Sequence, residues 1–200
     1  TQNNGSEDRC DIHFTTEALT NTILTHSMTQ IQSRTATIPK EVMMVLAVLQ
    51  DASFEAFLVG GCVRDLIMGR KPNDYDVTTN ATPEQIISLF PKTFYENTYG
   101  TVGVVTCGEE GLALCSDESV KIVEVTPYRL ESSYSDNRHP DNVTWSKDIH
   151  DDLKRRDFTC NAMAYNPVTN ELIDPFDGQK DIESRLIRAV GDADARFRED

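Results

Sequence analysis

Three acidic residues in this chain have the type and spacing of metal ligands. Asp74 and Asp76 stand two positions apart in a run that predicts a strand, so both carboxylates would project from one face. Adjacent carboxylates repel each other unless a cation joins them, and Mg²⁺ is commonly shared between carboxylates and substrate phosphates. Glu124 lies among strand-forming apolar residues and is either an edge-facing side chain or a third carboxylate. Such a trio suits two-metal phosphoryl or nucleotidyl transfer, with ions about 4 Å apart.

A glycine-rich turn precedes these acids. Gly60 and Gly61 join a predicted strand to a predicted helix, and paired glycines let a ligand approach the backbone closely. The helix start offers free N–H groups and the positive end of the helix dipole, which favour an anion. Arg64 adds a cationic fork for phosphate, and Asp65 follows it. A Gly-Gly turn alone is more typical of a structural turn, so the phosphate interpretation depends on the acidic pair downstream.

A second cationic segment spans 155–161. Arg155 and Arg156 offer charge for a triphosphate, and Asp157 and Asn161 offer hydrogen-bonding groups for a ribose. The alternative is a helix C-terminus that carries cations, which stabilises a helix by about 0.3–1 kcal/mol.

The elements expected to position these residues alternate between helix and strand. A Thr cap, a first-turn Pro and a Gln three residues after the cap predict a capping box at 82–85. The pattern indicates an α+β fold, a small mixed sheet flanked by helices and followed by a helical region. The expected helices are 39–49, 62–68, 82–89, 147–156, 161–165 and 179–186; the expected strands are 57–59, 74–78, 101–107 and 120–126; and 131–146 is expected to be a mobile loop.

Composition limits the classes of partner. The chain has 200 residues and a net charge of −14, which argues against a surface that coats duplex nucleic acid but not against a local basic cleft. No stretch approaches the ~18 consecutive apolar residues of a membrane span. The 5 cysteines form no CxxC pair, which favours free thiols in a reducing cytoplasm over zinc ligands.

The two ends of the chain differ from its middle. Residues 1–37 are polar and predict a weakly structured extension with no secretory signal. Residues 192–200 predict a helix start with no stop signal, which favours a fragment of a longer protein.

Six segments together resemble the family of class II tRNA nucleotidyltransferases and bacterial poly(A) polymerases, within the DNA polymerase β nucleotidyltransferase superfamily. The resemblance runs from about Ile38 to Asp200. It implies a polymerase-β-like catalytic head at 38–147, with the end of the head and the start of a helical neck at 148–200. The segments are LVGGCVRD (58–65), NDYDVTTNATPEQ (73–85), VEVTPYR (123–129), DLKRRDFTCNAMAYN (152–166), IDPFDGQKDI (173–182) and VGDADARFRED (190–200).

The resemblance also implies roles for individual residues. Asp74 and Asp76 match the catalytic Mg²⁺ ligands, and Glu124 matches an additional strand carboxylate. Asp200 matches an acid that hydrogen-bonds the nucleobase, which the family pairs with an Arg three residues further on. The remaining matches are nucleotide-binding positions: Gly60, Gly61 and Arg64 at the triphosphate, Asp65 supporting the turn, and Arg156, Asp157 and Asn161 at the sugar and phosphates.

The activity implied by the resemblance is template-independent transfer of CMP and AMP from CTP and ATP to the 3′ end of tRNA in the cytoplasm. Neck, body and tail helices outside this chain would hold most of the tRNA acceptor arm. Residues 134–140 resemble the flexible loop of CCA-adding members, which favours CCA addition over a poly(A) polymerase. A CC-only or A-only enzyme is also compatible with the motifs.

Two readings from outside this activity remain. A non-catalytic RNA-binding relative would share the fold, but the three carboxylates argue against it. A minimal nucleotidyltransferase acting on a small molecule would not be expected to carry the segments RRDFTCNA and GDADARFRED.

Overall fold

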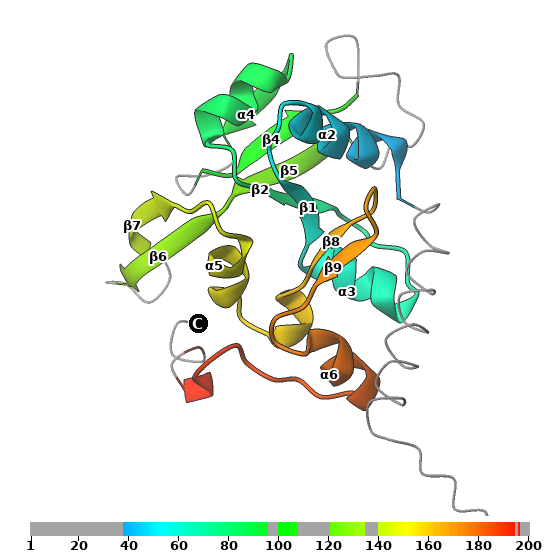
Figure 1. Cartoon of the computed structure of the whole chain (residues 1–200), viewed down its shortest axis with the longest axis vertical. Helices are drawn as coiled ribbons and strands as arrows, with labels where there is room; N and C mark the ends of the chain where they lie inside the picture. Colours follow the sequence, from blue (N-terminus) through cyan, green and yellow to red (C-terminus); the bar gives the residue numbers. More distant parts are fainter. Residues whose placement is uncertain (1–37, 96–99, 108–120, 135–139, 195, 197–200) are drawn as a thin grey trace, which may run out of the picture.

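The computed structural model describes residues 38–95, 100–107, 121–134, 140–194 and 196. Its elements, in chain order and shown in Figure 1, are α2 (Lys40–Asp51), β1 (Ala56–Val59), α3 (Gly61–Met68), β2 (Asp76–Thr79), α4 (Pro83–Leu89), β3 (Thr93–Tyr95), β4 (Val102–Val105), β5 (Ile122–Pro127), β6 (Arg129–Tyr134), β7 (Pro140–Trp145), α5 (Ile149–Lys154), the 3₁₀ turn η2 (Thr159–Asn161), β8 (Ala164–Asn166), β9 (Glu171–Ile173) and α6 (Gly178–Ser184).

The strands form a mixed sheet, as expected for the predicted α+β class. Its order is β3-β4-β5-β2-β1-β8-β9, with β2 and β5 parallel and the other neighbours antiparallel. Because the central strands β2 and β5 are parallel, both strands begin at the same end of the sheet. Residues at these two positions are therefore neighbours, although they are far apart in sequence.

One face of the sheet is the main core. Val77, Val104 and Val125 are fully buried there, and α2 and α4 contact β5 above them (Figure 1). The opposite face is covered over β1 by a second apolar cluster that includes Val59 and Leu153 of α5. Because the strands alternate, their polar positions face away from the main core. The site described below lies on that second face.

Local signals place several elements as predicted. The Thr82 side chain accepts a hydrogen bond from the Gln85 N–H, and the Gln85 side chain accepts one from the Thr82 N–H, so the capping box at α4 is confirmed. Pro83 occupies the first turn, and α3 ends at Gly69 in a left-handed conformation (φ 75°). These boundaries fix where the strands before and after the helices begin.

Two expectations about secondary structure were wrong. Residues 131–146 were expected to be a mobile loop, but β6 and β7 form an antiparallel hairpin there, with Arg129 opposite Trp145. Residues 161–165 were expected to be helical, but the chain forms η2 and then β8, whose three residues are all buried between β1 and β9. Strands are recognised in a sequence by alternating apolar and polar residues. The polar hairpin β6–β7 and the fully buried strand β8 both lack this alternation.

Cysteine chemistry is also partly different from expectation. Cys62 and Cys160 are free thiols, as predicted. Cys107 is disulfide-bonded, so the prediction of free thiols was wrong at that position. Spacing in the sequence does not reveal which distant sulfur atoms meet in the fold.

The described helices include none that is long and apolar enough to cross a membrane. The extension at 1–37 and most of 192–200 lie outside the described residues, and the division between 147 and 148 stays a prediction.

Candidate active site

The acidic pair lies at the start of β2. The strand begins at Asp76, so Asp74 precedes it and does not lie within it, in contrast to the predicted strand over 74–78. The intervening Tyr75 is buried, whereas Asp74 is exposed and Asp76 is half-buried. Burial and the negative charge of Asp74 raise the pKa of Asp76, and Arg156 acts in the opposite direction. The two carboxylates therefore act on each other as the sequence predicted, although only one is on the strand.

The third acid lies directly beside this pair. Glu124 on β5 is the register partner of Asp76 on the parallel strand β2, and its side chain is exposed. Register partners on neighbouring strands project from the same face about 4.8 Å apart. Within the described residues, no group of three or more His, Cys, Asp or Glu side chains is arranged to hold a metal ion. Glu124 is thus a neighbour of Asp76 on the same face.

The glycine turn brings a cation and a carboxylate to the same point. Gly60 has φ 78° and ψ −137°, a conformation that L side chains rarely adopt. A Cβ atom at Gly60 would lie 3.0 Å from Arg156 Nη1 and 3.8 Å from Asp76 Oδ2. The positive φ favours glycine here, and an added Cβ would also require the end of the Arg156 side chain to shift. The turn predicted to admit an anion lies next to Asp76 and Arg156.

Arg64 and Asn161 are joined across 97 positions of sequence. Arg64 Nη1 donates to Asn161 Oδ1 (2.8 Å), and Arg64 Nε donates to Asp65 Oδ1 (3.0 Å). Asn161 Nδ2 in turn donates to Asp157 Oδ1 (3.4 Å). Asp65 therefore orients the guanidinium of Arg64. The hydrogen bond between Arg64 and Asn161 joins the glycine-turn segment to the segment 155–161.

Arg156 is positioned by a residue that the sequence analysis missed. Asp152 on α5 is fully buried and accepts from Arg156 Nη2 (3.2 Å) and from Arg155 Nη2 (2.6 Å). Thr78 Oγ1 on β2 also donates to Asp152 (3.3 Å). Asp152 thus ties the cationic segment to the strand that carries Asp76. The signal in the sequence for this network is weak: Asp152 lies three residues before Arg155 and four before Arg156.

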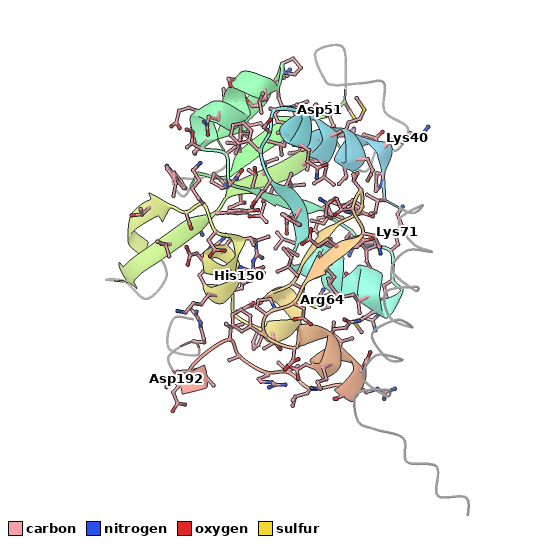
Figure 2. All side chains as sticks on the ribbon, in the orientation of Figure 1. Lys40, Asp51, Arg64, Lys71, His150 and Asp192 are labelled. Carbon is pink, nitrogen blue, oxygen red and sulfur yellow. The ribbon has the colours of Figure 1, made fainter. Side chains whose placement is uncertain are left out.

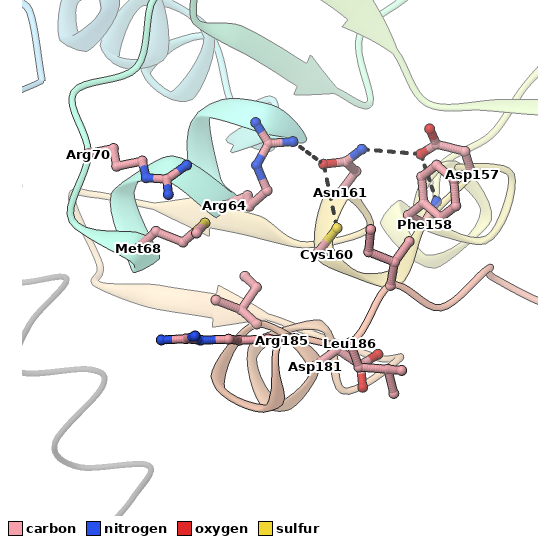
Figure 3. Close-up of a pocket in the computed structure, with 12 residues that line it drawn as sticks. Arg64, Met68, Arg70, Asp157, Phe158, Cys160, Asn161, Asp181, Arg185 and Leu186 are labelled. Atoms are coloured by element: carbon pink, nitrogen blue, oxygen red, sulfur yellow. Dashed lines mark hydrogen bonds between the residues drawn. The ribbon is translucent and has the colours of Figure 1, made fainter.

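A pocket of about 550 Å³ opens beside Arg64 and Asn161 (Figure 3). In Figure 2, Arg64 lies in the lower half of the view, away from Lys40 and Asp51 at the ends of α2. The far wall of the pocket is α6 and the residues after it, which include Arg185 and Leu186. Asp74, Asp76 and Glu124 are not among the residues lining the pocket. Asp200 lies outside the described residues, so its contact with a nucleobase stays a prediction.

Comparisons with known proteins identify the family. The sequence model described as "Poly A polymerase head domain" matches residues 56–188. The chain belongs to this family. The resemblance inferred from six segments is thereby confirmed, and the matched range holds every site residue named above except Asp200.

Relatives of this head-domain family are similar over most of the chain. It is 46% identical over 157 residues to a CCA-adding enzyme of Staphylococcus aureus (strain MRSA252). The aligned region covers 78% of this chain and 36% of the relative. It is 44% identical over 162 residues to a CCA-adding enzyme of Geobacillus thermodenitrificans. Here the aligned region covers 80% of this chain and 37% of the relative. The chain spans little more than a third of the length of these relatives.

Solved structures agree with the polymerase-β-like head fold. The CCA-adding enzyme of Bacillus stearothermophilus in complex with CTP matches with a TM-score of 0.65 and 39% identity, over 80% of this chain and 35% of that chain. A Thermotoga maritima CCA-adding enzyme complexed with tRNA matches with a TM-score of 0.52 and 23% identity, over 77% of this chain and 33% of that chain. The second match supports the fold alone.

Proposed function

We propose that the protein transfers CMP and AMP from CTP and ATP to the 3′ end of tRNA. The observation that carries the proposal is the meeting of Gly60, Asp76 and Arg156 at one point, beside a third acid in register on β5. A phosphate-binding turn beside a metal-binding carboxylate is the arrangement that nucleotidyl transfer requires. Two relatives at 44–46% identity are CCA-adding enzymes, and a solved CCA-adding enzyme at 39% identity is in complex with CTP.

The acids fit a divalent cation on chemical grounds. All their donor atoms are oxygen. Burial, and after it the negative charge of Asp74, raise the pKa of Asp76, and a bound cation would relieve the repulsion between the two carboxylates. Asp74 and Asp76 would hold Mg²⁺, which would supply charge stabilisation to the reacting phosphate and its leaving group.

The residues of the chain then have distinct tasks. Gly60 and Gly61 let the triphosphate approach the backbone, while Arg64 and Arg156 neutralise its charge. Asp157 and Asn161 would hydrogen-bond the ribose. Glu124 would face the entering 3′-hydroxyl of the RNA, because it is exposed and lies in register with Asp76. The oxygen of that hydroxyl bonds to the α-phosphorus as the bond between this phosphorus and the oxygen that bridges to the β-phosphorus breaks. Pyrophosphate leaves, and the hydroxyl proton passes to water or Glu124.

A poly(A) polymerase is the second candidate, favoured by the description of the matching family model. Incubating the full-length protein with tRNA lacking CCA, and giving CTP and ATP separately and then together, separates the candidates. CCA addition requires both nucleotides and stops after three residues. A poly(A) polymerase extends with ATP alone, and CC-only or A-only enzymes stop early.

A non-catalytic relative predicts a different result. Titration of CTP would then show binding that is independent of Mg²⁺, with no incorporation under any condition. The cytoplasmic location of this reaction is part of the proposal. The free thiols of Cys62 and Cys160 fit a reducing compartment, whereas the disulfide at Cys107 does not.

A further inference from the structure

An aromatic side chain lies in the same row of the sheet as the acids. Phe94 on β3 pairs with Gly103 on β4, Gly103 pairs with Glu124 on β5, and Glu124 pairs with Asp76 on β2. Register partners project from one face of a sheet. Phe94 therefore shares the face that carries Glu124 and Asp76, at the edge of the sheet.

The ring of Phe94 reaches inward along this row. A Cβ atom at Gly103 would lie only 2.4 Å from Cζ of Phe94, so the far end of the ring lies over the glycine. The next position along the row is Glu124, one strand spacing or about 5 Å away. Phe94 nevertheless stays 39% exposed. An aromatic surface is thus open to a ligand beside the third carboxylate.

The direction of the reaction decides which ligand can reach this surface. The cationic groups Arg64 and Arg156 lie on the β1 side of Asp76, next to the Gly60 turn. In phosphoryl and nucleotidyl transfer, the attacking oxygen and the leaving oxygen lie roughly in line on opposite sides of the phosphorus. A pyrophosphate that leaves toward the cations requires a hydroxyl that enters from the β5 and β4 side. The Phe94 ring lies on that side.

We propose that Phe94 stacks against the 3′-terminal base of the RNA and so places its hydroxyl next to Glu124. This inference rests on the proposed function, because it assumes an RNA end as the acceptor. Single-stranded nucleic acid ends are commonly recognised by bases stacked on aromatic side chains, and such a stack tolerates any base. A terminal nucleotide that changes identity with each addition needs that tolerance.

Tyr95 provides a matched control. It is the next residue on β3 and is 53% exposed, but its hydroxyl donates to Glu84 of α4 (3.4 Å), on the opposite face of the sheet. Phe94→Ala and Tyr95→Ala therefore each remove an exposed aromatic ring from the same edge strand, and Tyr95 is the more exposed of the two. If loss of an aromatic ring only weakened the edge strand β3, Phe94→Ala and Tyr95→Ala would have the same effect on RNA binding.

The first experiment measures binding without catalysis. A short RNA with 2-aminopurine as its terminal base is titrated with the full-length protein, because stacking quenches the fluorescence of this base. We expect quenching with the wild type, Phe94→Trp and Tyr95→Ala, and loss of quenching with Phe94→Ala. Gly103→Ala should also lose it, since the added methyl displaces the ring.

The second experiment measures nucleotide addition. Phe94→Ala should raise KM for the RNA by about 5-fold to 150-fold, the range for loss of one base–aromatic stack. KM for CTP should stay unchanged, and an RNA with an abasic terminal nucleotide should be insensitive to the substitution. Phe94→Trp should restore the wild-type KM.

Three results would overturn the stacking proposal: an unchanged KM for RNA, a rise in KM for CTP instead, or equal effects of Phe94→Ala and Tyr95→Ala. Failure of the proposed function is recognised separately, as a wild-type protein that adds no nucleotide to any RNA. Quenching of the terminal base by wild type but not by Phe94→Ala would still support the stack in that case.

Discussion

Asp152→Ala tests whether Arg156 acts as part of a fixed network. The wild-type carboxylate is fully buried and is shared by Arg155 and Arg156, with Thr78 as a third donor. Removing one partner of a buried ion pair destabilises a protein by about 3–5 kcal/mol, because the other charge stays behind. The two arginine side chains are 16% and 17% exposed, so water reaches both and the lower end of that range, about 3 kcal/mol, is expected.

The effect on nucleotide binding separates positioning from stability. Without Asp152, the Arg156 guanidinium loses its orientation toward Gly60, and the loss of one charge-assisted contact of about 1.5 kcal/mol raises KM for CTP about tenfold. Arg155→Ala is the control, since it removes the other partner of Asp152 but leaves Arg156 in place. Urea denaturation measures the free energy of unfolding, and initial rates measure KM. If both variants lose similar stability and neither changes KM, Asp152 has no positioning role.

The remaining predictions concern the turn, the acidic pair and a helix cap. Gly60→Ala should lower kcat/KM at least tenfold and destabilise the fold by about 1–3 kcal/mol, because φ is positive and the methyl meets Arg156; wild-type kinetics would contradict this. Asp76→Asn should abolish incorporation yet stabilise the fold. Burial and the charge of Asp74 raise the pKa of Asp76 in the folded protein. The stabilisation from protonated Asp76 is therefore complete at low pH and is lost as the pH rises through that raised pKa. The increase in unfolding free energy caused by Asp76→Asn should be greatest at neutral pH and absent in acid. In thermal unfolding, Mg²⁺ should raise Tm of the wild type but not of Asp76→Asn, and equal shifts would argue against the metal site. Thr82→Ala should cost about 1 kcal/mol by loss of the cap hydrogen bond with Gln85, with unchanged KM values; a change in KM would mean that α4 affects the site.

Features that depend on neighbouring positions were easier to predict from the sequence than features that depend on pairing between distant segments. Residues that act through local geometry were found directly: the Gly60 turn, the acids around Tyr75 and the cap at Thr82 each depend on a few neighbouring positions. Pairing between distant strands was only partly predictable. Glu124 was left open between two roles, because nothing in one sequence shows that β5 lies parallel to β2 with this register.

Residues that act through a buried network were missed for the same reason. Asp152 reads as one more acid on a charged helix, and its importance comes from burial and from Thr78 on a strand 74 positions away. Phe94 reads as part of a short apolar run. Its relation to Glu124 exists only through two successive strand pairings across a glycine.

The acidity of the chain is consistent with stacking as the way to hold an RNA end. The net charge is −14, and the row from Phe94 through Gly103 and Glu124 to Asp76 contains two acids and no cation. A phosphate placed over this row would be repelled, whereas the interaction of a base with an aromatic ring involves no net charge. Phosphate contacts give affinity a steep dependence on salt. The contribution of Phe94, measured as the ratio of KM between Phe94→Ala and wild type, should therefore stay constant between low and high salt even while both KM values change. A ratio that falls steeply with salt would mean that Phe94 acts through phosphate contacts elsewhere and not through a stack.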